Sequence, residues 1–530
     1  MIDLKKLSKK VVSGKLSRRD FMVKAIAAGA TVPFATHLLA ESAKAATPNK
    51  GGNLRMGIGH GSTTDSTNPA TWENGYMANV AGAFVNHLAE VNNKGEISPE
   101  LAESWESSPD AATWRFKLRK GLEFHNGKTV TAEDVIASFN HHRGDDTTSG
   151  AKGVAKPIKD IKADGDTVVF ELEGGNADFP FIASDYHFAI MPSKDGKIGA
   201  DGFDVGTGGF MIESYEPGVR TTFKRNPNYF KEGMAHFDSV EMLSILDANA
   251  RQSALITGDI DIMDRVDLKT VDLLARNPAV NIMETTGTLH YTFPMRTDTA
   301  PFDNNDVRMA LKLAFDRQEI VDKVLFGHGS VGNDHPISSA NQFHNSELPQ
   351  RQYDPEKAKW HLKQAGMEGL TVELSAADAA YGGAVDAAVL YKERAAAAGI
   401  NIEVVREPND GYWSNVWMNK PWCACYWGGR PTEDWMFSTA YQGGVDWNDT
   451  FWSNERFDAL LLEARSELDQ AKRHEMYGEM QAIVSNQGGV VVPMFANYVM
   501  GLSSKIAHHD DVAGNWDLDG NKAAERWWFS

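Results

Sequence analysis

A strand–helix–strand succession late in the chain is the feature that most limits the possible folds. Leu370–Leu374 and Ile400–Val405 are short apolar runs typical of strands, and the alanine-rich segment Ala384–Ala398 between them has the composition of a helix. Strands joined by a helical crossover pair in parallel. The chain is therefore predicted to be a mixed α/β protein.

Other segments add strands and helices. Thr113–Leu118 alternates apolar and polar side chains, which is typical of a half-buried strand. Thr131 is followed three residues later by an acid, and this pattern predicts the start of a helix. Pro355–Ala365 is predicted to be a helix that ends at Gly366. The further predicted strands are Gly51–Ile58, Thr167–Leu172 and Val490–Phe495, and the further predicted helices are Asp306–Phe315, Gln318–Leu325, Phe457–Ala464 and Ala471–Val484.

The first 45 residues have the pattern of an export signal. Arg18–Arg19 is a twin-arginine pair, Ala25–Ala40 is a short apolar core, and Ala43–Ala45 has small residues at the positions that a signal peptidase reads. The apolar core is shorter than the roughly 20 residues of a membrane-spanning helix. The paired arginines predict the bacterial twin-arginine route, with cleavage near Ala45 and a periplasmic mature protein.

The charge and length of the remaining chain limit its partners. Its 485 residues contain 44 Lys or Arg and 69 Asp or Glu, which gives a formal net charge of −25. This argues against nucleic acid or an anionic membrane surface as a partner. Such a length is too great for one core and predicts at least two lobes. Cys423 and Cys425 are expected to be buried thiols, because a bridge between such near neighbours would be strained.

Eight motifs occur in an order that resembles one family. They are Leu101–Glu106, Trp114–Gly127, Thr131–Val135, Val205–Phe210, Arg225–Tyr229, Gly258–Asp261, Asp306–Arg317 and Tyr353–Ala358. Together they resemble the family 5 extracellular solute-binding proteins, which are the dipeptide, oligopeptide and nickel receptors of ABC importers. The resemblance covers essentially the whole predicted mature chain.

This resemblance implies a two-lobed periplasmic binding protein of type II, in its large form with three subdomains. The ligand cleft would lie between lobes that are joined by two hinge crossovers, near His290–Tyr291 and near Asn497. The implied division is a signal peptide at 1–45, a first-lobe core at 46–83, 206–290 and 497–530, an inserted subdomain at 84–205, and a second lobe at 291–496.

Arg430 is the candidate that most affects the choice of ligand. The segment Tyr426–Phe437 resembles the stretch of peptide receptors in which an aspartate after a tryptophan binds the ligand α-ammonium. Aligned on Trp427, that position here is Arg430, whose planar guanidinium suits a carboxylate or phosphate. Either the ligand presents an anion to Arg430, or Glu433 or Asp434 binds the amine. A third possibility is that Arg430 pairs with one of these acids and only braces the loop.

Aromatic and hinge residues complete the predicted site. Seven tryptophans concentrate between positions 413 and 452, and two or three of them are expected to contact the ligand. His290 and Tyr291 are expected at the hinge, and Asp65 and Thr67 in the loop after the first strand. The predicted ligand-binding residues are Arg430, Trp427, Gly428, Gly429, Glu433, Asp434, Trp435, His290, Tyr291, Trp413, Asp65 and Thr67, with His60, Tyr186 and His187 as further candidates.

The predicted function is a monomeric periplasmic receptor that captures a short peptide or peptide-like, amino-acid-derived solute for an ABC permease in the inner membrane. An alternative is an oligosaccharide or an opine-like sugar conjugate, held on tryptophan rings without Arg430. An enzyme is not predicted, because the sequence has neither a Gly-x-Ser-x-Gly nor a His-Glu-x-x-His motif. No cofactor and no direct metal site are predicted, although a nickel chelate or haem stays a family option.

Overall fold

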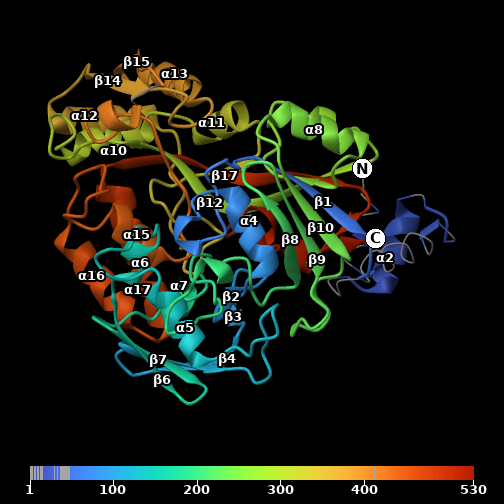
Figure 1. Ribbon diagram of the computed structural model, residues 1–530. Helices are drawn as coiled ribbons and strands as arrows, with labels where there is room; N and C mark the ends of the chain where they lie inside the picture. Colours follow the sequence, from blue (N-terminus) through green and yellow to red (C-terminus); the bar gives the residue numbers. More distant parts are fainter. Residues whose placement is uncertain are drawn as a thin grey trace.

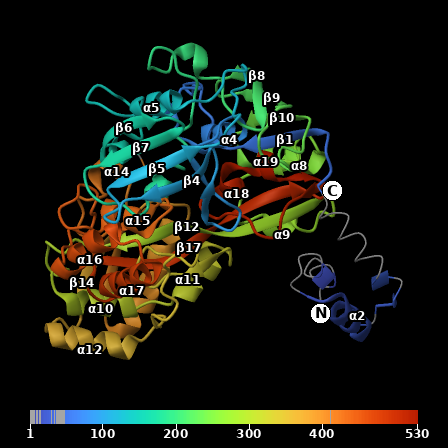
Figure 2. The same ribbon diagram turned by 90° about the horizontal axis from the view of Figure 1, so that it is seen from below.

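The computed structural model describes residues 48–409 and 412–530, together with positions 4, 7, 8, 11, 16–28, 30–32, 34 and 35. The twin-arginine pair opens helix α2 (Arg18–Ala27), whose N-cap Ser17 accepts a hydrogen bond from the backbone of Asp20. Helix α2 lies beside the body of the protein (Figure 2). The predicted cleavage position near Ala45 lies outside the described residues. Among the helices that are described, none has the length and apolarity needed to cross a membrane.

A mixed nine-stranded sheet runs through the body of the protein (Figure 1). Its order is β16-β12-β17-β11-β1-β10-β9-β8, and β13 pairs with β17. Strand β1 is parallel to both β10 and β11, and the other pairings are antiparallel. The strands are β1 (Asn53–Ile58), β8 (Phe210–Glu216), β9 (Arg220–Arg225), β10 (Ser239–Ser244), β11 (Ile262–Met263), β12 (Val280–Pro294), β13 (Gly329–Val331), β16 (Cys425–Trp427) and β17 (Val490–Ser503).

The two long strands β12 and β17 connect the two halves of the molecule. Their register runs from Val280 opposite Ser503 to Thr286 opposite Asn497, is interrupted, and resumes with His290 opposite Phe495. Such an irregularity bends the strand that contains it. The predicted crossovers lie at this interruption, and the division of the chain into 46–83, 84–205 and the later segments stays a prediction.

The first lobe, defined here as the body around β1 and β8–β11, has a core on each face of its sheet. Leu54 and Met56 of β1 pack with helix α4, while Ile260 packs with Leu255 of α8 and with α9 on the other face. The C-terminal residues close this lobe, because α18 and α19 contact α4. Its remaining elements are η1 (Pro69–Thr71), α4 (Gly75–Phe84), α8 (Ala248–Thr257), α9 (Val271–Leu274), β18 (Ile506–Ala507), α18 (Asp517–Asn521), α19 (Ala523–Arg526) and β19 (Trp528–Phe529).

The inserted subdomain is a separate antiparallel sheet of order β4-β5-β7-β6 with a core of its own. Helix α5 covers it, and the Phe139 ring lies 4.8 Å from that of Phe170. Thr131 and Asp134 form the expected capping box at the start of α5. Its elements are β2 (Ala89–Val91), β3 (Ile97–Pro99), β4 (Ala102–Ser107), β5 (Thr113–Leu118), α5 (Ala132–Asn140), α6 (Lys152–Ala155), β6 (Ile158–Asp164), β7 (Thr167–Leu172), α7 (Phe179–Ile182) and η2 (Ala200–Gly202).

The second lobe, defined here as the body formed by α10–α17, has two apolar cores. One lies around the predicted strand–helix–strand unit, in which β14 and β15 pair in parallel. The other lies among α15, α16 and α17. The elements are α10 (Asn305–Leu313), α11 (Arg317–Val324), α12 (Pro355–Ala365), β14 (Thr371–Ala376), α13 (Ala384–Ala395), η3 (Ala396–Ala398), β15 (Asn401–Arg406), α14 (Tyr412–Asn415), α15 (Glu433–Ala440), α16 (Glu455–Ser466) and α17 (Gln470–Gln487).

Most predicted elements are confirmed, and one differs clearly. Strands β5 and β7 have the predicted bounds, helix α12 ends at Gly366 with φ +67°, and both cysteines are buried free thiols. The last predicted strand is too short, because β17 continues to Ser503 where its second half pairs with β12 and β11.

We expect Gly82→Ala to destabilise the fold, because α4 packs directly on the C-terminal segment at this position. A Cβ at Gly82 would lie 1.9 Å from the backbone oxygen of Asn521. The backbone would have to shift, and overpacking of this kind lowers the free energy of unfolding by about 1–3 kcal/mol. Thermal unfolding followed by circular dichroism measures the effect. Gly153→Ala is the control, since its Cβ would meet nothing within 4 Å; an equal Tm for both variants would contradict the packing.

Candidate functional site

The two lobes touch through the inserted subdomain. Asp178 forms a 2.7 Å ion pair with Arg473 of α17, and both side chains are buried. The backbone N–H of Ala177 donates to the backbone oxygen of Arg465 at 2.7 Å. These contacts fix which surfaces of the two lobes face each other.

Arg430 lies on the side of the second lobe that faces the first. It follows β16, and its Nη1 donates to the backbone oxygens of Gly428 (3.0 Å) and Gly429 (3.3 Å). Among the described residues, no carboxylate comes within 4 Å of Arg430, and its Nε and Nη2 make no hydrogen bond. Burial lowers the pKa of Arg430, whereas Asp185 and Tyr186 of the inserted subdomain act to raise it. The guanidinium is thus held by the chain without being neutralised.

Asp185, Tyr186 and His187 form the opposing wall. Asp185 Oδ1 lies 2.7 Å from Nδ1 of His187 and also accepts its backbone N–H at 3.0 Å. The Tyr186 ring stacks on His187 at 4.1 Å and meets the edge of Trp516 at 6.1 Å. His187 Nε2 is buried, and none of the residues that the structure describes bonds to it. The wall therefore offers a carboxylate, a free ring nitrogen and aromatic faces.

His290 lies at the same place on β12. Its Nδ1 is 3.1 Å from the backbone oxygen of Thr288, so Nδ1 carries the proton and Nε2 is an acceptor. Burial lowers the pKa of His290 to about 4, and the charge of Arg430 acts in the same direction. The ring is neutral near pH 7, and Nε2 has no bonding partner within the described part of the chain.

The glycines before Arg430 are needed for the loop to lie against β12. A Cβ at Gly429 would come 1.5 Å from Oγ1 of Thr288. Gly428 has more space, since its Cβ would meet only Arg430, at 3.9 Å. Gly429 therefore allows the close approach that positions Arg430, and it makes no contact through a side chain.

Glu433 and Asp434, in contrast, are placed inside the second lobe. Glu433 accepts the backbone N–H of Phe343 at 2.6 Å, and Asp434 pairs with Arg465 at 3.0 Å. Neither is bonded to Arg430, so the loop brace considered from the sequence is not formed. Both carboxylates already have partners in the interior, and the structure does not favour them as a site for a ligand amine.

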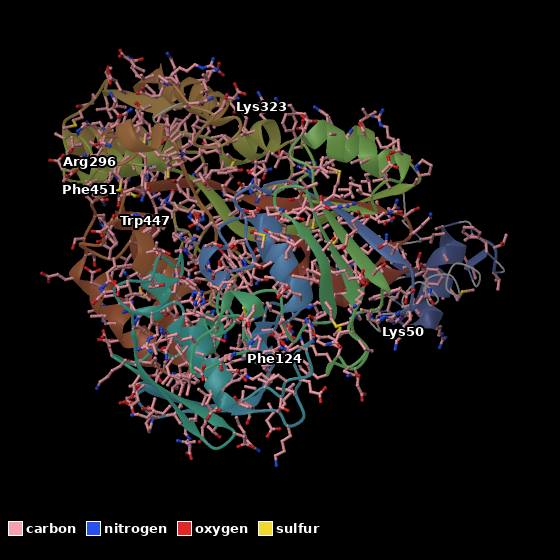
Figure 3. The ribbon with its side chains drawn as sticks, viewed as in Figure 1. Lys50, Phe124, Arg296, Lys323, Trp447 and Phe451 are labelled. Carbon is pink, nitrogen blue, oxygen red and sulfur yellow. The ribbon has the colours of Figure 1, made fainter. Side chains whose placement is uncertain are left out.

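The tryptophans separate into core and surface. Trp427 is buried in the core around α15–α17, and its Nε1 donates to Asp449 at 3.3 Å. Trp435 is half-buried on α15. Trp413 is 41% exposed, and its ring lies 5.5 Å from that of Tyr426. Trp447 is exposed on the side of the second lobe where Figure 3 also places Arg296 and Phe451.

The remaining candidates have structural contacts. Asp65 accepts hydrogen bonds from the backbone of Ser62 (2.7 Å) and from Asn74 (2.6 Å), so it holds the loop after β1. Thr67 is half-buried in this loop. Tyr291 stacks on Tyr381 with ring centres 4.1 Å apart.

Two charged residues of this region were absent from the predicted set, Asp185 and Arg265. Asp185 directly precedes the candidate Tyr186. Arg265 follows β11, and its Nη1 bonds to Nε2 of His60. The motif Gly258–Asp261 leads into β11, so the end of that strand was a signal that could have pointed to Arg265.

A buried acidic cluster has the geometry of a metal site but already contains a cation. Carboxylate oxygens of Glu90, Glu100 and Glu525 lie within 4.8 Å of one another. The ammonium of Lys231 bonds to all three, at 2.9, 2.7 and 2.9 Å, and Lys522 pairs with Glu100 at 3.2 Å. The pKa of Lys231 lies well above its usual value, because the glutamates outweigh the opposing effect of burial. This cluster is an internal ion network.

The buried Glu433 predicts a pH dependence of stability. Burial raises its pKa to about 7, well above the unfolded value of about 4.3. Between these values the unfolded chain has lost this proton and the folded chain has kept it, so stability falls as pH rises. Glu433→Gln keeps the acceptor for Phe343 and removes the ionisation. Relative to the parent, the variant should gain about 2–3 kcal/mol between pH 5 and pH 8.

Thermal and denaturant unfolding at the two pH values measure this difference. Glu403→Gln is the control, because Glu403 is exposed on β15. A Glu433→Gln curve that stays parallel to the parent curve from pH 5 to pH 8 would contradict a protonated, buried Glu433.

Comparison with known proteins places these features in a family. Residues 96–449 match the bacterial extracellular solute-binding proteins, family 5 (middle region). Di/tripeptide-binding protein 1 of Pseudomonas aeruginosa is 27% identical over 472 residues, which cover 79% of this chain and 84% of that protein. Heme-binding protein A of Haemophilus influenzae is 31% identical over 299 residues, 51% of this chain and 54% of that protein.

Among solved structures, HbpA2 from Haemophilus parasuis has the same fold. It superposes with a TM-score of 0.80 at 22% identity, covering 90% of this chain and all of that one. The fold is thus the two-lobed one of type II periplasmic binding proteins. The family match extends over more than half of the sequence. This chain belongs to the family 5 bacterial extracellular solute-binding proteins.

Proposed function

We propose that this protein is the periplasmic solute-binding component of an ABC importer, and that it binds a short peptide or peptide-like amino-acid derivative between its lobes. Membership of family 5 supports the receptor role. The likeness to a di/tripeptide-binding protein over 79% of the chain supports the ligand class. The observation that carries the proposal is Arg430, a guanidinium facing the first lobe without a carboxylate partner among the described residues.

The groups around Arg430 suit the end of a peptide or an amino acid. A ligand carboxylate can bond to two nitrogens of the guanidinium, which is the strongest geometry for this pair. Within the described part of the chain, His290 Nε2 is an acceptor without a partner. Asp185 uses Oδ1 for His187, and its carboxylate attracts a cation. These groups accept N–H donors from an amide or an ammonium. A carboxylate beside an amine or amide is the arrangement of an amino-acid unit.

Closure of the lobes is the proposed binding motion. We place the hinge at the interrupted register of β12 and β17, between Thr286 and His290. The Asp178–Arg473 pair then holds the inserted subdomain against the second lobe in the closed state. Export by the twin-arginine route, cleavage near Ala45, a monomeric state and delivery to an inner-membrane permease belong to the same proposal.

An oligosaccharide or opine-like sugar conjugate is the second candidate ligand. The observation that favours it is the pair of exposed rings at Trp413 (41%) and Tyr426 (44%). Flat aromatic faces stack on the apolar side of a sugar. A thermal-shift screen of the purified protein against dipeptides, tripeptides, disaccharides and sugar–amino-acid conjugates separates the two, because a ligand at a hundred times its Kd stabilises by about 2.7 kcal/mol.

We expect Arg430→Ala to weaken the best carboxylate-bearing ligand of that screen. Removing one partner of a buried charge pair costs about 2–5 kcal/mol, so calorimetric titration should show the Kd raised by about 30-fold or more. The same peptide with a C-terminal amide should bind the parent protein more weakly than the free acid does. For the Arg430→Ala variant, the amide and the acid should have nearly the same Kd. Arg406→Ala, at the exposed end of β15, is the matched control. Parent-like binding by Arg430→Ala would refute the role of Arg430.

We expect Asp178→Asn to favour the open state. Without its carboxylate partner, Arg473 leaves a charge uncompensated at the contact between the lobes, and the closed state is destabilised. Small-angle X-ray scattering of the ligand-free variant should give a larger radius of gyration, and the ligand Kd should rise as the closed fraction falls. Arg456→Gln is the control, since it breaks an exposed ion pair within the second lobe. An unchanged radius and Kd would show that the pair does not hold the lobes together.

A further inference from the structure

Arg265 and His60 lie together at one edge of the main sheet. Strands β1 and β11 are neighbours and parallel, and each of these residues follows the carboxyl end of its strand by two positions. Ligands of α/β proteins bind at this edge. Both residues have left-handed backbone conformations, with φ of 89° at His60 and 47° at Arg265. Such strain in residues other than glycine is concentrated at ligand-binding positions.

The guanidinium of Arg265 is held in place, and its Nη2 makes no hydrogen bond to any of the residues that the structure describes. Its Nη1 bonds to Nε2 of His60. Burial, followed by the charge of Arg265, lowers the pKa of His60, so the ring is neutral and accepts this bond. Asp517 and Asp264 form ion pairs with Nε of Arg265 at 3.6 and 3.8 Å, both longer than a hydrogen bond. The side chain remains 47% exposed.

Asp264, one of these two acids, also has other partners. Asp264 Oδ1 accepts the backbone N–H of Gly59 at 3.0 Å and pairs with Nε of Arg251 at 3.2 Å. In addition, a Cβ at Gly75, the first residue of α4, would lie 3.8 Å from Nη2 of Arg265. The start of a helix carries partial positive charge. An anionic group placed at Nη2 would be attracted by this helix start and by Arg265, in competition with the two acids at Nε.

The rings of Tyr186 and Trp516 lie between the surroundings of Arg265 and those of Arg430. Tyr186 faces Arg430 across the lobes, and the electrostatic effect of Arg430 opposes the burial that raises the pKa of Tyr186. The Tyr186 ring meets Trp516 at 6.1 Å, and Trp516 directly precedes Asp517, the acid 3.6 Å from Arg265. Both rings are half-buried. Tyr186 thus lies near Arg430 and Trp516 adjoins the acid that pairs with Arg265, and the two arginines belong to different lobes.

We propose that Arg265 is a second ligand anchor and that the ligand carries two anionic groups, one at Arg430 and one at Arg265, with its middle part against Tyr186 and Trp516. The inference rests on the proposed function, because it uses the same region between the lobes. It narrows the ligand class to acidic peptides and to amino-acid conjugates with two carboxylates. A ligand with a single carboxylate satisfies only one of the two arginines.

The test compares Ala-Glu with Ala-Gln, two dipeptides that differ in one carboxylate. By calorimetric titration of the purified full chain, the parent should bind Ala-Glu about tenfold or more tightly than Ala-Gln. Arg265→Gln should reduce this preference to about onefold while leaving the Kd for Ala-Gln nearly unchanged. Arg265→Lys should keep part of the preference, because it keeps the charge. Arg430→Ala should weaken both dipeptides.

Controls make the outcomes distinct. Arg276→Gln removes an exposed arginine just after α9 in the same lobe and should preserve the parent preference. Tm values verify that each variant folds; if Arg265→Gln does not, the Arg265→Lys ratio decides. Equal binding of the two dipeptides by the parent, or an unchanged preference in the Arg265 variants, overturns the inference and leaves the proposed function standing. Failure of both dipeptides to bind overturns the inference together with the peptide assignment.

Discussion

The antiparallel pairing of β12 with β17 is the constraint on which the rest of this structure depends. About 200 residues separate the two strands in the chain, yet they form one ladder. The ladder belongs to the first lobe at Val280–Thr286 and to the second lobe from His290 onward, after the interruption. Strand β16 then pairs with β12 at His290, which fixes the start of the loop that ends in Arg430. The ladder therefore fixes the position of the central candidate residue, and its interruption is where we propose that the lobes move.

Acids and backbone oxygens hold the buried cations of this fold. Arg465 is neutralised by Asp434, Arg473 by Asp178, and Lys231 by three glutamates. These acids are buried except Glu90, which is half-buried. A buried cation without such a partner is costly. Lys312 bonds instead to backbone oxygens in the interior of the second lobe. Arg430 also bonds to backbone oxygens, those of its own loop, but it faces Asp185 and Tyr186 across the lobes. A bound anion would neutralise Arg430, as the acids neutralise Arg465, Arg473 and Lys231.

The sequence was a good guide wherever the cause is local. Capping residues and alternation predicted α5, α12, β5 and β7, because these signals lie within one turn or one strand. The length of β17 was underestimated, since its partner β12 is far away in the chain. Arg430 was predicted from a motif, but Asp185, whose charge acts on it, comes from a segment some 240 residues earlier. Glu433 and Asp434 looked equally available in the sequence, and only the packing of Phe343 and Arg465 against them places both in the interior.

Two anchors on different lobes couple recognition to closure. A ligand group bound at one arginine alone interacts equally with the open and closed arrangements, and such binding does not shift their equilibrium. A ligand that reaches both Arg430 and Arg265 interacts fully only when the lobes approach. The affinity of such a ligand for the closed state then exceeds its affinity for the open state by the contribution of the second contact. The Asp178–Arg473 pair stabilises the closed state separately, with or without ligand. The Asp178–Arg473 pair lies between the inserted subdomain and α17, so it stabilises the closed state for any ligand. The choice among ligands then depends on the two arginines.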